Sequence, residues 1–254
     1  MSRLTSTAIV LRTRPYGESD LIVDLFTQSH GRTTVIAKGA LKSKKRYMGA
    51  LELGHILKVD YLIKPQFSVL GACDIIQSHW KIRQSLKALK QLYYILEICL
   101  LATPYEEQDL ALYQSLVELL AALESEPGLD ESYLFMWELN LFSHLGYHLH
   151  IGRCPITEEA PSGLSALTGG CIAAEAGKAY WPVDINALRT LYRLQQSPSS
   201  DFVFETLFNA EEEQQVRQAF AGLWSSICGV SLKSLAVFNT LHPQITSSAL
   251  NRIG

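Results

Sequence analysis

The chain has 254 residues, of which 48% are apolar and 19% charged, and this composition indicates a folded globular protein rather than a disordered one. Its net charge of −3 hides an asymmetry, because residues 1–80 carry 11 basic and 6 acidic side chains whereas the remainder carries a net charge of −8. No apolar run approaches the ~20 residues of a membrane span, no secretory leader is visible and the five cysteines are scattered like reduced thiols, so we expect a cytoplasmic protein.

Residues 1–80 predict five short strands separated by turn residues. Segments rich in β-branched and aromatic side chains alternate with glycine, proline and serine, a pattern typical of a small all-β domain. We expect the strands at residues 6–12, 21–27, 33–38, 56–63 and 68–76. A five-stranded OB-type barrel is the natural candidate, because closing the sheet removes the exposed edges that so small a sheet would otherwise have.

From about residue 81 the apolar side chains recur every three or four positions, which is the period of one helix face. The first such face consists of Ile82, Leu86, Leu89, Tyr93, Leu96 and Leu100. Helices are expected at about 82–100, 112–123, 134–145, 185–194 and 211–228, with a last short one around Leu232, Leu235 and Phe238. Residues 151–182 are rich in glycine and proline and predict an irregular insert.

These elements predict an α+β fold with two parts. An OB-type domain is expected over residues 1–80 and a helical domain over residues 81–254, with the irregular insert at about 151–182 inside the second. The basic charge lies in the first part and the acidic charge in the second, which favours a module for polyanions attached to another kind of module. Chance variation of surface charge is the alternative.

The loop expected between the third and fourth strands, residues 38–49, is basic and contains no acidic residue. Its cations are Lys38, Lys42, Lys44, Lys45 and Arg46. Nucleic-acid phosphates bind such cations, and loops of OB barrels commonly hold single strands. We therefore predict a nucleic-acid-binding surface here, which Arg12, Arg14 and Arg32 could extend. A solvated loop without a ligand is the alternative.

Aromatic side chains near this loop could stack on bases. Tyr47 lies within the loop, and both a stacking role and a place in the core are open for it. Tyr16 and Phe67 are further candidates. Phe26 and Tyr61 lie in the middle of expected strands, so we expect both to be buried.

Arg83, Lys87 and Lys90 step by four and three along the first expected helix. The ordinary interpretation of such a stripe is the polar face of an amphipathic helix. It could instead continue the path of a nucleic acid or contact a partner protein.

No catalytic constellation is visible in the sequence. It contains no G-x-S-x-G, no phosphate-binding P-loop and no dinucleotide-binding glycine motif. Cys73 and His79 are close in sequence, but nothing marks them as a nucleophile and its base. We therefore expect a protein that is not an enzyme.

Several short motifs together resemble the RecO family of bacterial recombination mediators. They are Ala8-Ile9-Val10-Leu11, Tyr16-Gly17-Glu18-Ser19-Asp20, Phe26-Thr27, Gly31, Ala37-Lys38-Gly39-Ala40 and Leu145-Gly146-Tyr147, in the order and spacing of that family. The ordered set is specific, although each piece alone is weak. The resemblance fades after about residue 185, where only Leu232-Lys233-Ser234 continues it.

The resemblance implies an N-terminal OB fold, a helical domain and, in many members, a zinc-ribbon-like insert. It implies DNA repair by recombination: binding single- and double-stranded DNA, annealing strands, and helping to load recombinase onto strands coated by single-strand-binding protein. The implied partners are RecR and the acidic tail of single-strand-binding protein, and the implied location is the bacterial nucleoid. A protein-interaction module, in which the acidic helical domain is the functional part, is the alternative.

The sequence departs from the family at the zinc site. Where zinc-containing members carry two Cys-x-x-Cys pairs, this chain has Cys154 with Thr157 and Cys171 with Ala174. Two thiolates are half of the four ligands that a structural zinc takes, so we predict no zinc and no other cofactor. His144, His148 and His150 precede Cys154 and could complete a mixed site, but Gly146 is expected to end the helix between the first two. A disulfide between Cys154 and Cys171 is conceivable only under oxidation.

Overall fold

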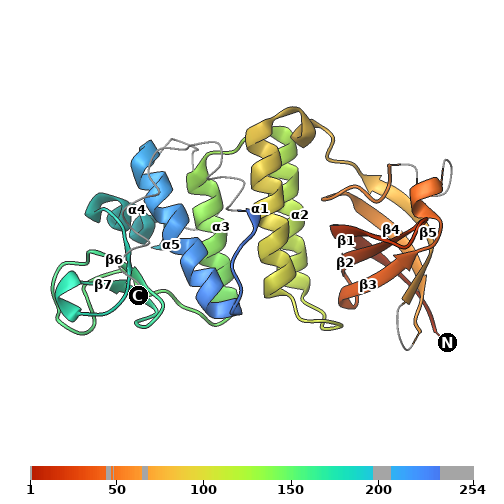
Figure 1. Cartoon of the computed structure of the whole chain (residues 1–254). Coiled ribbons are helices and arrows are strands. Elements are labelled where there is room, and N and C mark those ends of the chain that lie inside the picture. The colour runs from red at the N-terminus through yellow and green to blue at the C-terminus, as the bar shows by residue number, and fades with distance from the viewer. Residues whose placement is uncertain (1, 44–46, 48, 65–67, 197–206, 235–254) are drawn as a thin grey trace. The chain divides into compact units, whose positions relative to one another are not determined.

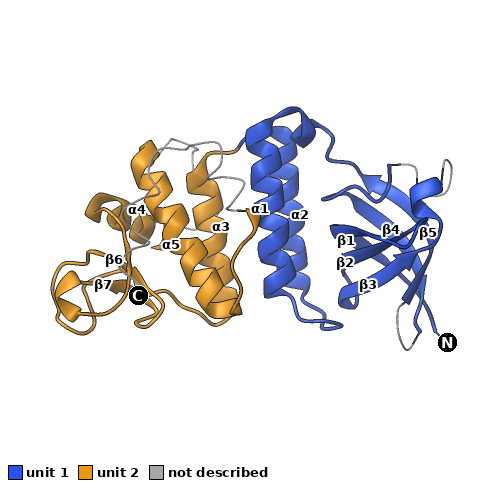
Figure 2. Ribbon diagram, in the orientation of Figure 1, with its two compact units in different colours: residues 1–128 blue, residues 129–254 orange. Residues whose placement is uncertain are grey.

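The computed structural model describes residues 2–43, 47, 49–64, 68–196 and 207–234. The chain divides into two compact units, residues 1–128 and residues 129–254, which Figure 2 distinguishes by colour. The change from strands to helices lies near residue 81, and the first two helices belong to the same compact unit as the strands. Within the described ranges, no helix is long and apolar enough to cross a membrane.

Unit 1 begins with a closed five-stranded barrel (Figure 1). Its strands are β1 (Arg3–Tyr16), β2 (Asp20–Thr27), β3 (Gly31–Ala37), β4 (Ile56–Leu62) and β5 (Ser68–Gln77). Their order around the barrel is β1-β2-β3-β5-β4, with only β3 and β5 parallel among these pairs. The long β1 pairs with β4 through its first half and with β2 through its second, and the register shifts between Val10 and Arg12. This five-stranded barrel confirms the predicted OB-type fold.

Alternate side chains of the strands fill the barrel interior. The buried residues include Val10, Val23, Leu25, Val35, Leu57, Val59 and Leu70. The connection from β3 to β4 contains the short 3-10 helix η1 (Ala40–Lys42) and adds Tyr47, Ala50 and Leu51 to the same core. The segment that carries the basic loop is therefore anchored by its own apolar residues.

Helices α1 (Leu86–Ala102) and α2 (Leu110–Ser125) form a pair beside the barrel in unit 1 (Figure 1). Phe26 of β2 meets Tyr113 of α2 edge to face, with ring centroids 5.6 Å apart. Ile9 and Leu11 of β1 are buried as well. Because side chains that alternate with the barrel interior point outward, these apolar residues give the helices a surface to pack on.

The buried face of α1 differs from the predicted one. Leu96 is buried as predicted, but Leu86 and Tyr93 are 62% and 55% exposed, so the predicted face is only partly right. The buried face also includes Leu92, Ile95 and Cys99. The prediction carried one helical period back to Ile82. That residue lies instead in a separate 3-10 helix, η2 (Lys81–Gln84), and α1 begins only after the N-cap Ser85.

In its described residues, unit 2 contains three α-helices and a small sheet. The elements are α3 (Glu131–His144), β6 (Gly163–Ser165), β7 (Gly170–Ile172), β8 (Trp181–Pro182), α4 (Ile185–Gln196) and α5 (Ala210–Cys228). The helices confirm the predicted ranges, and the sheet, with order β7-β6-β8, lies inside the expected irregular insert. Leu232 is buried, whereas Leu235 and Phe238 lie outside the described residues.

The end of α3 follows the sequence signal at Gly146, which has a φ of 86°. The N–H of Gly146 donates to Ser143 O and the N–H of Tyr147 donates to Phe142 O. This pair of bonds is a Schellman cap, which needs a left-handed residue and therefore favours glycine.

A buried ion pair joins α3 to α5 in unit 2. Arg217 donates to Glu138, which is fully buried, and to Glu131. The other oxygen of Glu138 accepts from Trp224 Nε1 at 3.0 Å, and Trp224 stacks on Phe142 with centroids 4.3 Å apart. A buried charge is tolerated only with such partners, so this contact sets how the two helices pair.

Candidate nucleic-acid interface

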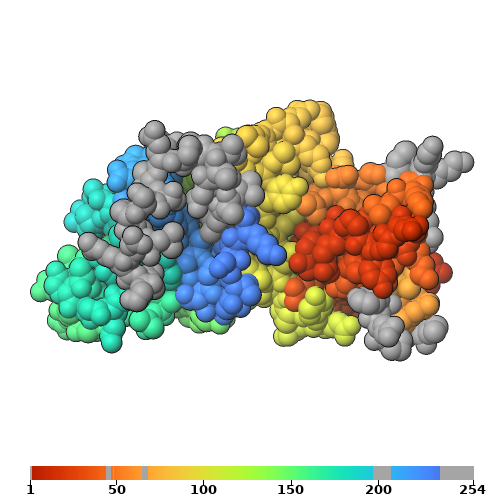
Figure 3. Space-filling view, viewed as in Figure 1, coloured from red at the N-terminus to blue at the C-terminus, as the bar shows by residue number. Residues whose placement is uncertain are grey.

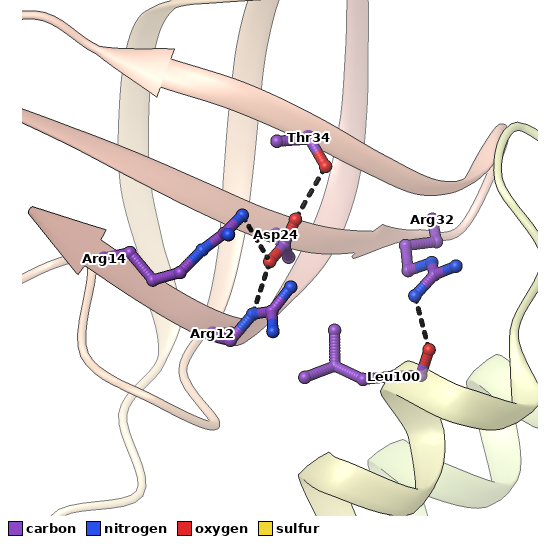
Figure 4. A network of polar contacts seen from close by, with 6 residues as sticks. All are labelled: Arg12, Arg14, Asp24, Arg32, Thr34 and Leu100. Atoms are coloured by element: carbon purple, nitrogen blue, oxygen red, sulfur yellow. Dashed lines mark hydrogen bonds and ion pairs between the residues drawn. The ribbon is translucent and has the colours of Figure 1, made fainter. Parts of the chain in front are cut away.

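Two of the predicted arginines share one buried carboxylate on the barrel (Figure 4). Arg12 Nε and Arg14 Nη2 of β1 lie 2.7 and 3.5 Å from Asp24 Oδ2 of β2, and Thr34 of β3 donates to the other oxygen at 2.6 Å. Asp24 is fully buried, whereas the two arginine side chains are 44% and 48% exposed. Two cations against one anion leave a net positive charge at this surface, and Asp24 holds both guanidiniums in place.

Arg32 is tied to the helices rather than to this pair (Figure 4). Its guanidinium donates to Leu100 O, one of the last carbonyls of α1, and lies 3.8 Å from the ring centroid of Tyr105. Its backbone also accepts from the N–H of Glu106 at 2.9 Å. A cation at a helix C-terminus is electrostatically favourable, so this arginine has a structural contact that the sequence did not reveal.

Gly31 explains why the chain between α1 and α2 can come so close to β3. Its φ is 65°, and a Cβ built on it would lie 1.9 Å from Glu107 O. A side chain at this position would therefore collide with the backbone of the α1–α2 connection.

The start of the basic loop is tied to the turn between β1 and β2. Asp20 Oδ1 accepts from the Gly39 N–H at 2.8 Å, and the Leu41 N–H donates to Ser19 O at 2.9 Å. The Gly39 hydrogen bond, with one from the Ser19 hydroxyl, lowers the pKa of Asp20. Ser19 and Asp20 were not among the predicted site residues. Their signal was present, since they belong to the same motif set as Lys38 and Gly39.

Lys38 and Lys42 are exposed at this end of the loop. Lys44, Lys45 and Arg46 lie outside the described residues, so their predicted contacts stay predictions. In the space-filling view the N-terminal strands, coloured red, form a broad surface of unit 1 (Figure 3). The described part of the candidate surface therefore comprises Arg12, Arg14, Lys38 and Lys42.

Tyr47 belongs to the core and not to the surface. It is 5% exposed, packs with the barrel interior and donates from its hydroxyl to Leu70 O at 3.1 Å. A ring held this way has no face for a base, so the stacking role considered for it is corrected. Phe26 and Tyr61 are buried, as expected, and Phe67 lies outside the described residues. Tyr16, which is 49% exposed at the end of β1, keeps an accessible side chain.

The predicted stripe of Arg83, Lys87 and Lys90 does not lie on one helix. Arg83 is in η2, where it donates to His79 O at 3.0 Å and to Leu53 O at 3.2 Å and pairs with Glu52 at 3.3 Å. It therefore joins η2 to the β3–β4 connection. Lys87 is exposed on α1 and Lys90 is half-buried.

The insert of unit 2 contains two free cysteines, Cys154 and Cys171. Burial raises the pKa of the Cys154 thiol, but hydrogen bonds from the Thr157 hydroxyl and from backbone N–H groups, including that of Ala173, bring it down to about 7. Burial raises the pKa of Cys171, to which the Gly152 N–H donates. Thr157 stands where the Cys-x-x-Cys pattern would have its second cysteine, and its hydroxyl donates to Cys154.

These residues do not fit a zinc ion. Among the described residues, no three histidine, cysteine or carboxylate side chains converge as metal ligands. Cys154 and Cys171 supply two thiols where a structural zinc takes four ligands. His144 ends α3 and His148 lies beyond Gly146, so the two are not on one helix face, and His150 Nε2 contacts Arg153 O at 2.8 Å.

Two family models match the chain. The one described as "Recombination protein O N terminal" covers residues 1–79, and the one described as "Recombination protein O C terminal" covers residues 83–236. The chain is 33% identical over 190 residues to a Geobacter sulfurreducens protein, covering 73% of this chain and 78% of the relative. It is 28% identical over 257 residues to a Syntrophobacter fumaroxidans protein, covering 95% and 99%. Both relatives are named DNA repair protein RecO.

Proposed function

The chain belongs to the RecO family of DNA repair proteins, and on this premise we propose that it is a recombination mediator that binds DNA through unit 1. In this proposal it binds and anneals single strands and helps to load recombinase onto strands coated by single-strand-binding protein. RecR and the acidic tail of single-strand-binding protein are the proposed protein partners. The names of the relatives directly support the role in DNA repair.

One observation supports the proposed DNA contact most strongly. Arg12 and Arg14 share the single buried carboxylate of Asp24, so β1 presents two oriented guanidiniums that retain net positive charge. Lys38 and Lys42 are exposed at the start of the basic loop, which Asp20 holds against the β1–β2 turn. Fixed cations favour binding, because less conformational entropy is lost when a phosphate arrives.

We also propose that the chain acts without a catalytic centre. His79 is fully buried, and its Nδ1 donates to Gly54 O at 2.7 Å, which makes it a structural residue of the barrel. Burial lowers the pKa of His79. The pairing with Cys73 that a nucleophile would need has no support from this geometry.

Fluorescence anisotropy with labelled single-stranded DNA tests the proposed contact. We expect a variant with Lys44, Lys45 and Arg46 all changed to Glu to bind at least about tenfold more weakly than the wild type, because three phosphate contacts become repulsive. Lys58, Lys81 and Lys178 are exposed, and changing these three to Glu gives a control with the same change in net charge.

Equal affinity of the wild type and the loop variant would refute the assignment of the surface. Equal loss in the loop variant and the control would show that only net charge matters. If neither the wild type nor any variant bound DNA at about 0.1 M salt while the acidic tail peptide of single-strand-binding protein bound well, the protein-interaction module would be the better description.

A further inference from the structure

Unit 2 contains a pocket of about 740 Å³ between the insert and α4. Residues 151–153 and 159–161 of the insert and Cys171 line one side, and residues of α4 line the other. Sites for small molecules commonly occupy about 300–1,000 Å³ and combine apolar walls with a few polar groups. The volume therefore suits a small organic ligand.

Three arginines line this pocket. Arg189 and Arg193 lie one turn apart on α4, and Arg153 comes from the insert. Unit 2 has only 7 basic residues against 12 acidic ones, so nearly half of its basic side chains meet at one place in an acidic unit. A general solvated surface would not be expected to gather them in this way.

Two of these arginines have no carboxylate partner among the described residues. Arg153 donates to Glu158 O at 3.0 Å and Arg189 contacts Asn186 Oδ1 at 3.4 Å. By contrast, Arg3, Arg12, Arg14, Arg83 and Arg217 each form an ion pair with an Asp or Glu. Each guanidinium has five N–H donors in a flat fork that matches phosphate, so Arg153 and Arg189 keep donors for an anion.

The rest of the lining matches a flat, partly apolar group. Ile151 and Leu188 are buried and form apolar wall, and Tyr192 is 50% exposed beside Arg193. An aromatic face of this kind can stack on a nucleobase. Glu159 adds one acceptor at the same pocket. It can accept N–H groups of a base edge but repels a ligand that carries only carboxylates.

We propose that this pocket binds one nucleoside phosphate. The phosphate lies against the guanidiniums, and the base lies against the apolar wall and Tyr192 with its N–H groups toward Glu159. The nucleotide is either free or part of a single strand. The strand form rests on the proposed DNA-binding function and adds a second contact in unit 2, whereas the free form does not depend on that function.

Titration of the full chain with fluorescent GMP, and separately with a short single-stranded oligonucleotide, tests this proposal. Changing Arg153 and Arg189 to Gln should weaken GMP binding by about tenfold or more, because each lost charge-assisted hydrogen bond to phosphate weakens binding. Arg153 and Arg189 are both exposed, so the fold should survive these changes, which a circular dichroism melt checks. Changing Lys178 and Lys233 to Gln is the control with the same charge loss outside the pocket lining.

The outcomes separate this proposal from the proposed function. Retention of GMP binding when Lys44, Lys45 and Arg46 are changed to Glu supports an independent pocket, whatever happens to the oligonucleotide. Oligonucleotide binding that falls in the pocket variant, without binding of free GMP, supports the strand as the source. If neither ligand binds, or if the pocket variant binds both like the control, the proposal is overturned. Arginine-dependent binding of an acidic peptide in place of GMP overturns it too.

Discussion

Arg12 of β1 and Arg32 of β3 show that one residue type serves two purposes on strands of the same barrel. Arg12 faces a buried carboxylate and keeps nearly half of its side chain exposed, whereas Arg32 donates to the end of α1 and covers Tyr105. Both were predicted to contact DNA from charge alone. The difference lies in their neighbours, since a guanidinium already held by a helix terminus has fewer donors left for phosphate.

At the insert, single residues decide whether a metal can be held. Thr157 donates to Cys154 where a second thiolate would be needed, and Ala174 has no ligand atom at all. Changing Thr157 and Ala174 to Cys should therefore create a four-thiolate site that takes up about one zinc per chain, while the wild type carries much less than one. Elemental analysis of protein purified without an affinity tag measures both.

The matched control changes Thr157 and Ala174 to Ser, which adds oxygens but no thiolates. Stoichiometric zinc in the wild type would contradict the expectation for this insert. Failure of the double cysteine variant to bind zinc, with the serine control equally empty, would mean that the four positions do not face one point.

At the scale of elements, the contact between β3 and the end of α1 links the barrel to the helical pair. Arg32 of β3 donates to the carbonyl of Leu100 near the end of α1, and its side chain is half-buried. Changing Arg32 to Gln should lower the free energy of unfolding by about 2 kcal/mol, the usual value for losing a hydrogen bond to a charged group. Urea denaturation measures this change.

Arg14 provides the comparison for Arg32. Its ion pair with Asp24 is 3.5 Å long, against 2.7 Å for that of Arg12, and its side chain is 48% exposed. Changing Arg14 to Gln should therefore cost less than about 1 kcal/mol of stability. The same change should weaken single-stranded DNA binding more than the change at Arg32 does. The reverse order in both measurements would mean that Arg32, and not Arg14, faces the ligand.

The elements differ in how well the sequence predicts them. The strands of the barrel were found because alternation and turn residues are local signals. The buried face of α1 was found only in part, because the helix is apolar on several sides and a 3-10 turn at Lys81–Gln84 shifts its phase. The sequence left the position of Tyr47 open, although its spacing to Ala50 and Leu51 hints that the end of the basic loop returns to the core.

At the scale of the whole molecule, charge is divided unevenly. Unit 1 carries 15 basic and 13 acidic residues, and unit 2 carries 7 and 12. An acidic molecule that binds DNA must do so through a local basic surface. Its affinity should therefore fall steeply with salt, with a slope of log affinity against log salt near −0.7 for each phosphate contact to a single strand.

Titrations at several salt concentrations give this slope for each protein. Changing Lys44, Lys45 and Arg46 to Glu should make the slope less steep by about 2, since three contacts are removed. Changing Lys58, Lys81 and Lys178 to Glu should leave it nearly as it was. An unchanged slope in the loop variant would mean that other cations carry the binding.

The sequence alone determined the barrel, the helices, the basic loop and the presence of only two cysteines in the insert, because these depend on local periodicity, turn residues and residue identity. Only the tertiary structure decided which cations are available. Arg32 and Leu100 are 68 positions apart, and Arg12, Asp24 and Thr34 come from three strands, so no local pattern reveals these contacts. The same holds for Arg153 and Arg189, which share a pocket only after the insert folds beside α4. How much of a charge is left for a partner depends on the neighbours that the whole fold brings to it, as Asp24 does for Arg12 and Arg14.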